Sequence, residues 1–477
     1  MKRSREMVQI EITSRVLLAL LIISHLVISG CDSKLEVAAP PPMPAPASSP
    51  PTDTMPPAQI MGLIATDAYD GRINLWWDKS AADDFDHYTV YASQPEITSV
   101  VGIAPRQQIK DISITTYQVT GLEAGVTHYF AVTAVDKTGN ENKNVTSVRS
   151  LSTPMPRGKI DPELGVDVYQ PDKVWAGTTL LPDNHNPQKP RIIEVNMPGE
   201  IIWEYVVPDS LRRVSGRGLN PGFDAELLPN NNILFVSPGK GVYEIDRKGN
   251  VVWSYLTARI SHDADRLPNG NTIFVCGDND QKSDAQVTEV DSKGEVVWHW
   301  YARDHFDKPP YQDIFKQGWT HTNAVTRLTN GNTLVSLRNF NVMVEVDPQG
   351  TVVRTPGEGI YNSPHDPAVL ANGNILAVSQ WRDRPHSAIE MDPETGKTVW
   401  QFGIPLRENW PVRDANRLPN GNTLITGSTR IVEVTPDKNI VWQLTLKSVT
   451  FDISTEQGHN EASGLGFYKA DRTGAER

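Results

Sequence analysis

The sequence predicts an all-β chain in which a six-bladed β-propeller follows a smaller β-sandwich. Two repeated signatures predict the propeller: a Leu-Pro-Asn-Gly-Asn-like turn and a strand that ends in tryptophan. Short strands separated by turns over residues 58–155 predict the sandwich. At 477 residues the chain is too long for one ordinary core, so several domains are expected.

The N-terminus has the pattern of a secretory signal. Lys2, Arg3 and Arg5 precede an apolar run over 16–28, which is shorter than the ~20 residues that span a bilayer. The run ends in Ile-Ser-Gly-Cys31, which resembles the bacterial lipobox. We therefore expect a lipoprotein signal peptide over 1–30 and acyl chains, palmitate among them, on Cys31. The protein would then be anchored in a membrane of the cell envelope and face the periplasm.

Residues 31–57 are rich in proline and have no hydrophobic periodicity. Such a segment favours extended polyproline conformations and acts as a semi-rigid spacer. We interpret it as a tether between the membrane anchor and the folded domains.

Residues 58–155 contain several apolar strands, including 73–78, 87–93, 116–122 and 127–136. The segment resembles a fibronectin type III module, with Trp76 or Trp77 as the core tryptophan and Leu122 and Tyr129 near a corner. The resemblance implies a β-sandwich and says little about function, because this fold serves many roles.

The segment 160–477 contains the internal repeat. Each copy has a strand with a central glutamate, a turn, and a strand that in five copies ends in tryptophan; in the fourth copy Arg354 takes that place. The glutamates are Glu194, Glu244, Glu289, Glu345, Glu390 and Glu433, and the tryptophans are Trp203, Trp253, Trp298, Trp400 and Trp442. The turns follow Leu181, Leu228, Leu267, Leu328, Leu370 and Leu418. Asn-Gly is a strong hairpin signal, so six copies of strands and turns predict six blades.

The repeat places several histidines together. Five residues before each turn leucine stand, in order, Ala176, Phe223, His262, Asn323, His365 and Arg413. Innermost strands surround the central channel, so these positions are expected to meet at one mouth of it. His321 lies two residues before Asn323 and would share its strand face. Arg338, at the end of a second strand, should join them; Arg382 and Arg430 are weaker candidates.

The other chemically active residue types have simpler interpretations. Asp224, Asp263, Asp366 and Asp414 recur one position later and are interpreted as structural links between blades. His185, His299, His305, His386 and His459 are expected to be surface or packing residues. Cys31 and Cys276 are the only cysteines, so no disulfide framework is expected, and Cys276 is interpreted as a buried small side chain.

Asn323, the stretch SLRNF with Arg338, a later His-Asp before an Asn-Gly turn, and the tail GFYKADR resemble the bacterial arylsulfate sulfotransferase family. That resemblance implies a periplasmic six-bladed propeller that moves a sulfuryl group from an aryl sulfate to a phenol, without a cofactor. It implies that His365 is transiently sulfated and that His262, His321 and Arg338 support catalysis. Arg413 and Asn323, which the repeat places at the same channel mouth, are expected to bind substrate. The chain departs from the family in its sandwich and lipid anchor, in lacking the cysteine pair of some relatives, and in Pro364 and Pro367 around His365.

Other functions stay open at this point. A non-catalytic lipoprotein would use the propeller to bind a glycan, a peptide or another envelope component. Three imidazoles can bind zinc, but Arg338 and Arg413 favour an anion, so no metal is expected. The tryptophan repeat is also similar to quinoprotein propellers, without a cofactor signature. The net charge of −12 argues against a nucleic-acid partner, and the oligomeric state is not predicted.

Overall fold

The computed structural model describes residues 53–214, 218–220, 222–381, 385–404, 411–447 and 465–473. The chain divides into a unit of residues 1–52 and a unit of residues 53–477, and the second carries the fold. The predicted signal peptide, Cys31 and nearly all of the tether therefore lie outside the described residues. Within the described ranges no helix has the length and apolar character needed to cross a membrane.

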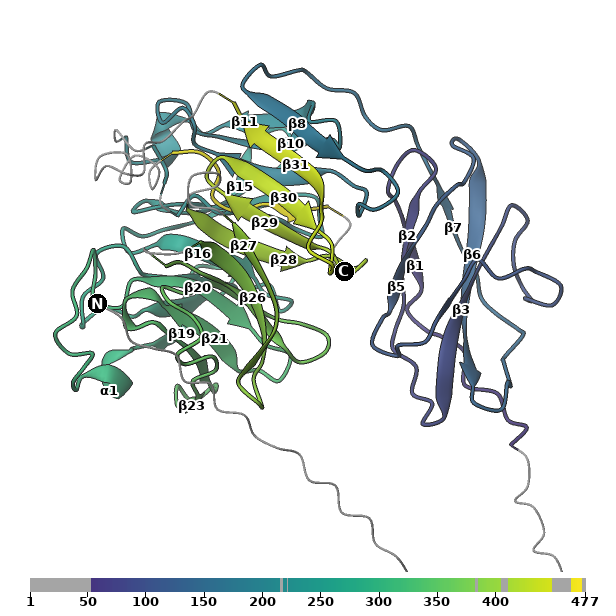
Figure 1. Cartoon of the computed structure of the whole chain (residues 1–477). Helices are drawn as coiled ribbons and strands as arrows, with labels where there is room; N and C mark the ends of the chain where they lie inside the picture. Colours follow the sequence, from purple (N-terminus) through teal and green to yellow (C-terminus); the bar gives the residue numbers. More distant parts are fainter. Residues whose placement is uncertain are drawn as a thin grey trace, which may run out of the picture. The chain divides into compact units, whose positions relative to one another are not determined.

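The first part of the folded unit is the predicted sandwich, made of two antiparallel sheets (Figure 1). One sheet has the order β1-β2-β5, with β1 Ile64–Asp67, β2 Ile73–Trp76 and β5 Thr116–Val119. The other has the order β4-β3-β6-β7, with β4 Gln107–Ile109, β3 Phe85–Ser93, β6 Thr127–Asp136 and β7 Val148–Leu151. Both sheets contribute inward-facing side chains to one core, as in other β-sandwiches.

Trp76, the last residue of β2, and Trp77, which directly follows it, have different roles. Trp77 is fully buried in the sandwich core together with Leu122. Trp76, on the other side of the strand, packs edge-on against Trp175, with ring centroids 6.2 Å apart. Successive residues of a strand face opposite ways, so a Trp-Trp pair fills two different clusters. Of the two predicted core tryptophans, Trp77 is the one that fills the sandwich.

Six antiparallel sheets follow one another along the rest of the chain and form the six blades of the propeller (Figure 1). The second blade contains β12 Ala225–Leu227, β13 Ile233–Ser237, β14 Gly241–Ile245 and β15 Val251–Leu256. The third contains β16 Ser261–Arg266, β17 Thr272–Val275, β18 Val287–Val290 and β19 Val296–Trp300. The fourth contains β20 Thr322–Arg327, β21 Thr333–Leu337, β22 Val342–Val346 and β23 Val352–Arg354. The fifth blade contains β24 His365–Val369, β25 Ile375–Ser379, β26 His386–Asp392 and β27 Lys397–Ile404. The sixth contains β28 Val412–Arg417, β29 Thr423–Gly427, β30 Arg430–Val434 and β31 Ile440–Leu446. The short helices are η1 Asp209–Leu211, α1 Arg303–Phe306 and η2 Arg338–Phe340.

The first blade combines strands from both ends of the propeller segment. Its sheet has the order β11-β10-β9-β32, with β9 Thr179–Asp183, β10 Arg191–Val195, β11 Ile201–Val206 and the C-terminal β32 Asp471–Arg472. The strand β8, Leu164–Tyr169, in turn adds to the outer edge of the sixth blade beside β31. Each end of the segment thus completes a blade that begins elsewhere in the chain.

This arrangement corrects the repeat assignment of the first blade. Leu181 lies on β9, the second strand, and not at the end of an innermost strand. Ala176 therefore precedes a second strand and does not belong to the channel mouth. The innermost strand of the first blade is β32, and the stretch Tyr-Lys-Ala-Asp-Arg at 468–472 is the counterpart of His-Asp-Ala-Asp-Arg at 262–266.

The tryptophan signature holds the blades together. Each of five indole Nε1 groups donates a hydrogen bond to a carbonyl in the next blade: Trp203 to Arg247, Trp253 to Ser292, Trp298 to Pro348, Trp400 to Pro436 and Trp442 to Met197, at 2.9–3.1 Å. The last of these joins the sixth blade to the first. In the fourth blade Arg354 replaces the indole and reaches Glu394 of the fifth blade at 3.6 Å. The departure from the repeat therefore keeps the same link with a different group.

The recurring aspartates also connect neighbouring blades, as predicted. Asp224 Oδ2 accepts from the backbone N–H of Ala264 at 3.3 Å, and Asp263 Oδ2 accepts from that of Val325 at 2.6 Å. Asp414 Oδ2 accepts from the N–H of Ala470 at 3.1 Å. Each carboxylate thus satisfies a buried backbone donor on the next innermost strand, which would otherwise cost about 1–3 kcal/mol.

Candidate functional site

The innermost strands are irregular where the candidate residues lie. The pairing register between the first and second strands shifts across His262 in the third blade, Asn323 in the fourth, Asp366 and Pro367 directly after His365 in the fifth, and Arg413 in the sixth. A β-bulge leaves a residue outside the ladder and redirects its side chain. A β-bulge therefore lies at or directly beside a candidate residue in each of four successive blades.

Several residues in this region have a left-handed backbone, which is uncommon for residues other than glycine, and three of them are histidines of the site or directly follow one. These three are His262 with φ 66°, His321 with φ 47° and Asp366 with φ 47°. His321 precedes β20, so its place depends on this backbone turn and not on the two-residue period of a strand that the sequence suggested. Such conformations cost of order 1–3 kcal/mol each and cluster at functional sites.

The structure brings the three histidines together from different blades. The rings of His262 and His321 are T-shaped, with centroids 4.8 Å apart. All three side chains are buried, His365 being 7 % exposed and the other two less. Electrostatic interactions connect His262 with both His321 and His365. The predicted residues His262, His321 and His365 thus lie close together in the structure.

The hydrogen bonds of His365 define its tautomer. Its Nδ1 lies 2.9 Å from the carbonyl oxygen of Ser363, which only accepts, so Nδ1 carries the proton. The Nδ2 of Asn323 lies 3.0 Å from both ring nitrogens, so it lies against the ring face and leaves the lone pair of Nε2 available. His365 consequently presents a neutral imidazole with a basic Nε2. The same reasoning applies to His321, whose Nδ1 lies 2.8 Å from the carbonyl of Gln317.

Two arginines supply positive charge beside the histidines. Arg338 is the first residue of η2 and is half-buried, and its charge acts on all three imidazoles. Arg413 is 3 % exposed; it donates to the carbonyl of Phe467 at 3.2 Å and lies 4.7 Å above the ring of Tyr468. Burial, with help from Arg338, lowers the pKa of Arg413 to about 10, so the guanidinium stays charged at pH 7.

These surroundings keep the histidines neutral. Burial and then Arg338 lower the pKa of His321 to about 3. Burial also lowers the pKa of His262 and that of His365 well below the usual value, and Arg338 and Arg413 act in the same direction. The site is therefore a buried cluster of neutral imidazoles beside two guanidinium groups, which suits an anion and a nucleophile at neutral pH.

Tyr468 and Lys469 are site neighbours that the sequence reasoning missed. The Tyr468 ring centroid lies 6.2 Å from that of His262. Lys469 pairs with Asp224 at 3.6 Å, with Asp366 at 2.9 Å, and with Asp263. Burial lowers the pKa of Lys469, but these carboxylates outweigh it and raise the pKa well above its usual value. Aligning 468–472 with 262–266 would have identified both residues as members of the first blade.

The carboxylates around Lys469 exceed the charge that one ammonium group neutralises. Burial raises the pKa of Asp263 to about 8, against the opposing effect of Lys469. For Asp366, burial opposes ionisation but Lys469 prevails, so its pKa lies below the usual value. Lys469 therefore anchors the C-terminal segment to the residues that directly follow His262 and His365.

The remaining candidates lie elsewhere. Arg382 and His459 are outside the described residues, and Arg430 begins β30 in the sixth blade. His386 is buried, and its Nδ1 accepts from the backbone N–H of Val412 at 3.2 Å. Burial raises the pKa of Cys276 to about 12, so this thiol stays protonated at neutral pH. In the described residues the ring nitrogens of the three histidines do not come within 4.8 Å of one another as a group.

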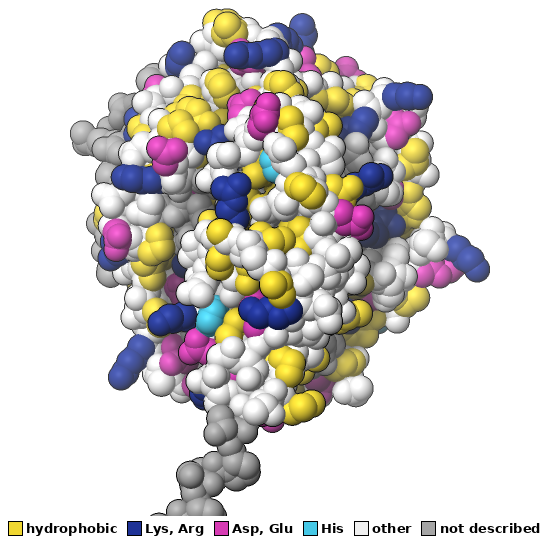
Figure 2. Space-filling view, turned by 90° about the vertical axis from the view of Figure 1, so that its right-hand side faces the viewer, with side chains coloured by type: hydrophobic (Ala, Val, Ile, Leu, Met, Phe, Trp, Pro, Cys, Tyr) yellow, Lys and Arg dark blue, Asp and Glu magenta, His cyan; other side chains and the backbone are white. Residues whose placement is uncertain are grey.

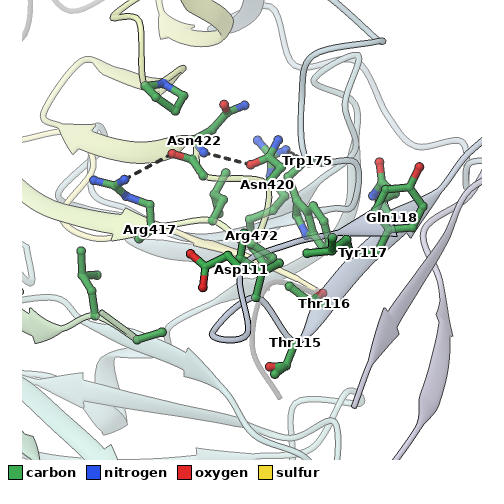
Figure 3. A pocket seen from close by; sticks show the side chains of 18 of the residues that line it. Asp111, Thr115, Thr116, Tyr117, Gln118, Trp175, Arg417, Asn420, Asn422 and Arg472 are labelled. Atoms are coloured by element: carbon green, nitrogen blue, oxygen red, sulfur yellow. Dashed lines mark hydrogen bonds between the residues drawn. The ribbon is translucent and has the colours of Figure 1, made fainter. Parts of the chain in front are cut away.

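A large pocket of about 1220 Å³ lies away from the histidines. Its lining includes Tyr117, Trp175, Arg417 and Asn420, at the turn end of the sixth blade, and contains no histidine. Figure 3 shows Asn422 at this turn, where its Nδ2 donates to the carbonyl of Lys173 at 2.8 Å. Because the convergent cationic and imidazole groups lie at the opposite end of the innermost strands, we place the candidate site there.

Charges on the outer surface are mixed in sign. On the face in Figure 2, Lys and Arg side chains are scattered among Asp and Glu side chains. This distribution agrees with the acidic net charge of −12 and differs from the basic stripe of a nucleic-acid-binding face.

Comparisons with known proteins address the propeller. Residues 168–355 match the family model described as arylsulfotransferase (ASST). The matched range contains His262, His321, Asn323 and Arg338, and ends before His365 and Arg413. The match confirms the predicted resemblance for this part of the propeller.

Other similarities cover parts of the chain. An amylopullulanase of Thermoanaerobacterium saccharolyticum is 28 % identical over 164 residues, which is 34 % of this chain and 10 % of that protein. A Bacteroides caccae protein of unknown function matches with 17 % identity and a TM-score of 0.42, over 62 % of this chain and 97 % of the other. An Fn3-like protein from Clostridium thermocellum matches 22 % of this chain and 99 % of its own, with 28 % identity and a TM-score of 0.17.

Proposed function

We propose that the propeller, whose residues 168–355 match the arylsulfotransferase family, transfers a sulfuryl group from an aryl sulfate to a phenol through His365. The observation that carries this proposal is the convergence of three neutral imidazoles and two guanidinium groups from four blades on one buried site. A sulfate monoester needs cations for its oxygens and a neutral nucleophile for its sulfur, and the site offers both.

In the first half-reaction Nε2 of His365 attacks the sulfur. A nitrogen–sulfur bond forms, the sulfur–oxygen bond to the aryl group breaks, and the electron pair leaves with the phenol oxygen. The Nδ1 proton stays on the ring, hydrogen-bonded to the carbonyl of Ser363. A phenol, with a pKa of about 10, is a tolerable leaving group, and Arg338 and Arg413 stabilise the sulfuryl oxygens throughout.

The proton balance is maintained by His321 or His262. Without a ligand both imidazoles are neutral, because burial and the arginines lower their pKa. An entering sulfate anion offsets the arginine charges and raises the imidazole pKa, so one imidazole enters the reaction protonated. It protonates the departing phenol oxygen and later accepts the proton of the acceptor phenol, a contribution of about 10²–10⁴-fold.

In the second half-reaction the acceptor phenol attacks the sulfur of sulfated His365. The nitrogen–sulfur bond breaks, and the neutral imidazole is restored. The two halves share one covalent intermediate, so the kinetics should be ping-pong. Asn323 and Arg413 contact the substrate in this scheme, because their donors lie beside Nε2 and beside Arg338 respectively.

The direct test is turnover of a chromogenic aryl sulfate, 4-nitrophenyl sulfate, with phenol as the acceptor. The proposal expects nitrophenol release that depends on phenol and an equal yield of phenyl sulfate. Phenol-independent release of nitrophenol together with inorganic sulfate would indicate a hydrolase. Neither activity, in a folded protein, would favour the non-catalytic propeller that binds an envelope component.

We also propose that Cys31 carries the lipid anchor and that the propeller faces the periplasm. The support is the lipobox-like sequence and the proline-rich tether that follows it. Cys31→Ala should move the protein from the membrane fraction to the soluble fraction and leave the signal peptide uncleaved. Unchanged fractionation and processing of this variant would contradict the proposal.

A further inference from the structure

Asp280 is a buried carboxylate in the loop that follows β17 of the third blade, and the sequence reasoning did not single it out. Its side chain is not exposed to solvent. Oδ1 accepts from the backbone N–H of His321 at 3.0 Å. Oδ2 accepts from Thr320, through N–H at 3.1 Å and through Oγ1 at 2.8 Å, and from Nε2 of Gln286 at 3.1 Å. The carbonyl of Asp280 also accepts from the backbone N–H of Trp319 at 2.9 Å.

One residue of the third blade therefore holds three consecutive residues that lead into the fourth blade. The approach is close enough to require glycine on both sides. A Cβ on Gly318, which has φ +124°, would lie 2.3 Å from Oδ1 of Asp280. A Cβ on Gly277 would lie 2.0 Å from the carbonyl oxygen of Thr322. The loop and the segment 318–322 thus form one tightly fitted unit.

This unit holds the backbone of His321 in a conformation that is unfavourable by itself. His321 has a left-handed φ of 47°, a conformation that persists only where the surroundings hold it. Asp280 holds the backbone amide of His321, while the carbonyl of Gln317 holds its Nδ1 at 2.8 Å. With the backbone and one ring nitrogen both fixed, the orientation of the ring and of its basic Nε2 is determined.

We propose that Asp280 is a positioning residue, whose carboxylate holds His321 in the orientation that exchanges a proton with the phenol oxygen. The inference rests on the proposed function, and it selects His321, and not His262, as the acid and base. The Nδ1 of His262 is buried without a hydrogen-bond partner, so no comparable contact fixes its tautomer. Proton transfer is sensitive to geometry, so a small displacement of His321 should lower the rate.

Asp280→Asn is the informative variant, because it keeps the shape and replaces one acceptor oxygen by an N–H donor that faces other donors. Asp136→Asn is the matched control. Asp136 is a buried aspartate of the sandwich, and it accepts from the backbone N–H groups of Thr138 and Asn140 and from both of their side chains. Thermal unfolding of both variants shows that each is folded.

The first readout compares two donors, 4-nitrophenyl sulfate and phenyl sulfate. Nitrophenol is far more acidic than phenol and needs little protonation to leave. Asp280→Asn should therefore lower kcat/KM for the donor phenyl sulfate, which reports only the first half-reaction, at least tenfold more than kcat/KM for 4-nitrophenyl sulfate, and Asp136→Asn should change neither. A purely structural role would reduce both donors by the same factor, and that result would overturn the inference.

The second readout is a double variant. If Asp280 acts through His321, Asp280→Asn combined with His321→Ala should be no slower than His321→Ala alone, and multiplied losses would contradict the inference. A third readout needs no activity: backbone hydrogen exchange at 320–321 should be faster in Asp280→Asn than in Asp136→Asn. Unchanged exchange would refute the positioning role. Absence of turnover in the wild type would instead refute the proposed function, which keeps the two failures distinct.

Discussion

The side-chain amide nitrogen of Asn323 lies 3.0 Å from Nε2 of His365, and the two residues come from neighbouring blades. The same nitrogen lies 3.2 Å from the carbonyl oxygen of Pro364. The backbone directly before His365 is thus tied to the fourth blade. The hydrogen bond between Nδ1 and the carbonyl of Ser363 leaves Nε2 as the ring nitrogen that can react.

Removing this donor should weaken the site without unfolding it. Asn323→Ala deletes a hydrogen bond that, with a bound sulfate oxygen, is worth about 1.5–3 kcal/mol. We expect a corresponding loss in kcat/KM for any aryl sulfate. Asn330→Ala, in the turn at the opposite end of the same strand pair, is the control and should keep full activity. Equal losses in the two variants would show that Asn323 acts only through stability.

The pH dependence of kcat/KM should reflect the lowered histidine pKa. The nucleophile His365 is active when it is neutral, and its folded-state pKa lies well below 6.5 because of burial and Arg338. Because protonation of His365 inactivates it as a nucleophile, kcat/KM should fall only when the pH drops through this lowered pKa. With 4-nitrophenyl sulfate, whose leaving group needs little protonation, we expect kcat/KM to stay nearly constant from pH 7 to below pH 6. An acid limb centred at 6.5 or higher would mean that the nucleophile lies in an ordinary aqueous environment.

The arginine nearest the histidines should matter far more than the other sequence candidates. Arg338→Ala removes a charge that acts on all three imidazoles, so donor turnover should fall by about 10²-fold or more. Arg430→Ala and Arg382→Ala serve as charge-matched controls, the latter outside the described residues. The measurement is steady-state turnover of 4-nitrophenyl sulfate. Similar losses in all three variants would place the anion site elsewhere.

Lys469 should stabilise the fold in a pH-dependent way. Lys469→Met leaves the buried carboxylates of Asp224, Asp263 and Asp366 without their cation, which should cost about 3–5 kcal/mol at pH 8. Carboxylates that take up protons lose their negative charge and no longer repel one another, so the destabilisation should shrink as the pH falls. Thermal unfolding at pH 8 and pH 5 measures this difference. A destabilisation that grows towards pH 5 would contradict the arrangement.

The repeat predicted most of the fold because each repeated signature makes one kind of contact between blades. The Trp-to-carbonyl bond, seen from Trp203 to Trp442, uses the same residue type in five of the six blades, so it is visible as a repeat in the sequence. The first blade was misassigned because Leu181 follows a pattern like that of a turn leucine but lies on a second strand. Its innermost strand is contributed from almost 300 residues later, which local periodicity does not reveal.

The site was predictable where it depends on repeat position, and not where it depends on backbone detail. His262, His365 and Arg413 occupy equivalent places, so counting from the turn located them. The reason they converge is the bulge in each innermost strand, which leaves no mark in the residue pattern. Asp280 escaped notice because it contacts His321 through a backbone amide, which any residue type supplies.

The most direct test of the central claim is detection of the covalent intermediate on His365. Purified protein would be incubated with 4-nitrophenyl sulfate and no acceptor, quenched at alkaline pH, digested, and examined by mass spectrometry, with His365→Asn treated in parallel. We predict a burst of about one nitrophenol per molecule, a sulfuryl adduct on the peptide that contains His365, and its loss when phenol is added. An unmodified His365 during active turnover, or wild-type turnover in the His365→Asn variant, would contradict the account.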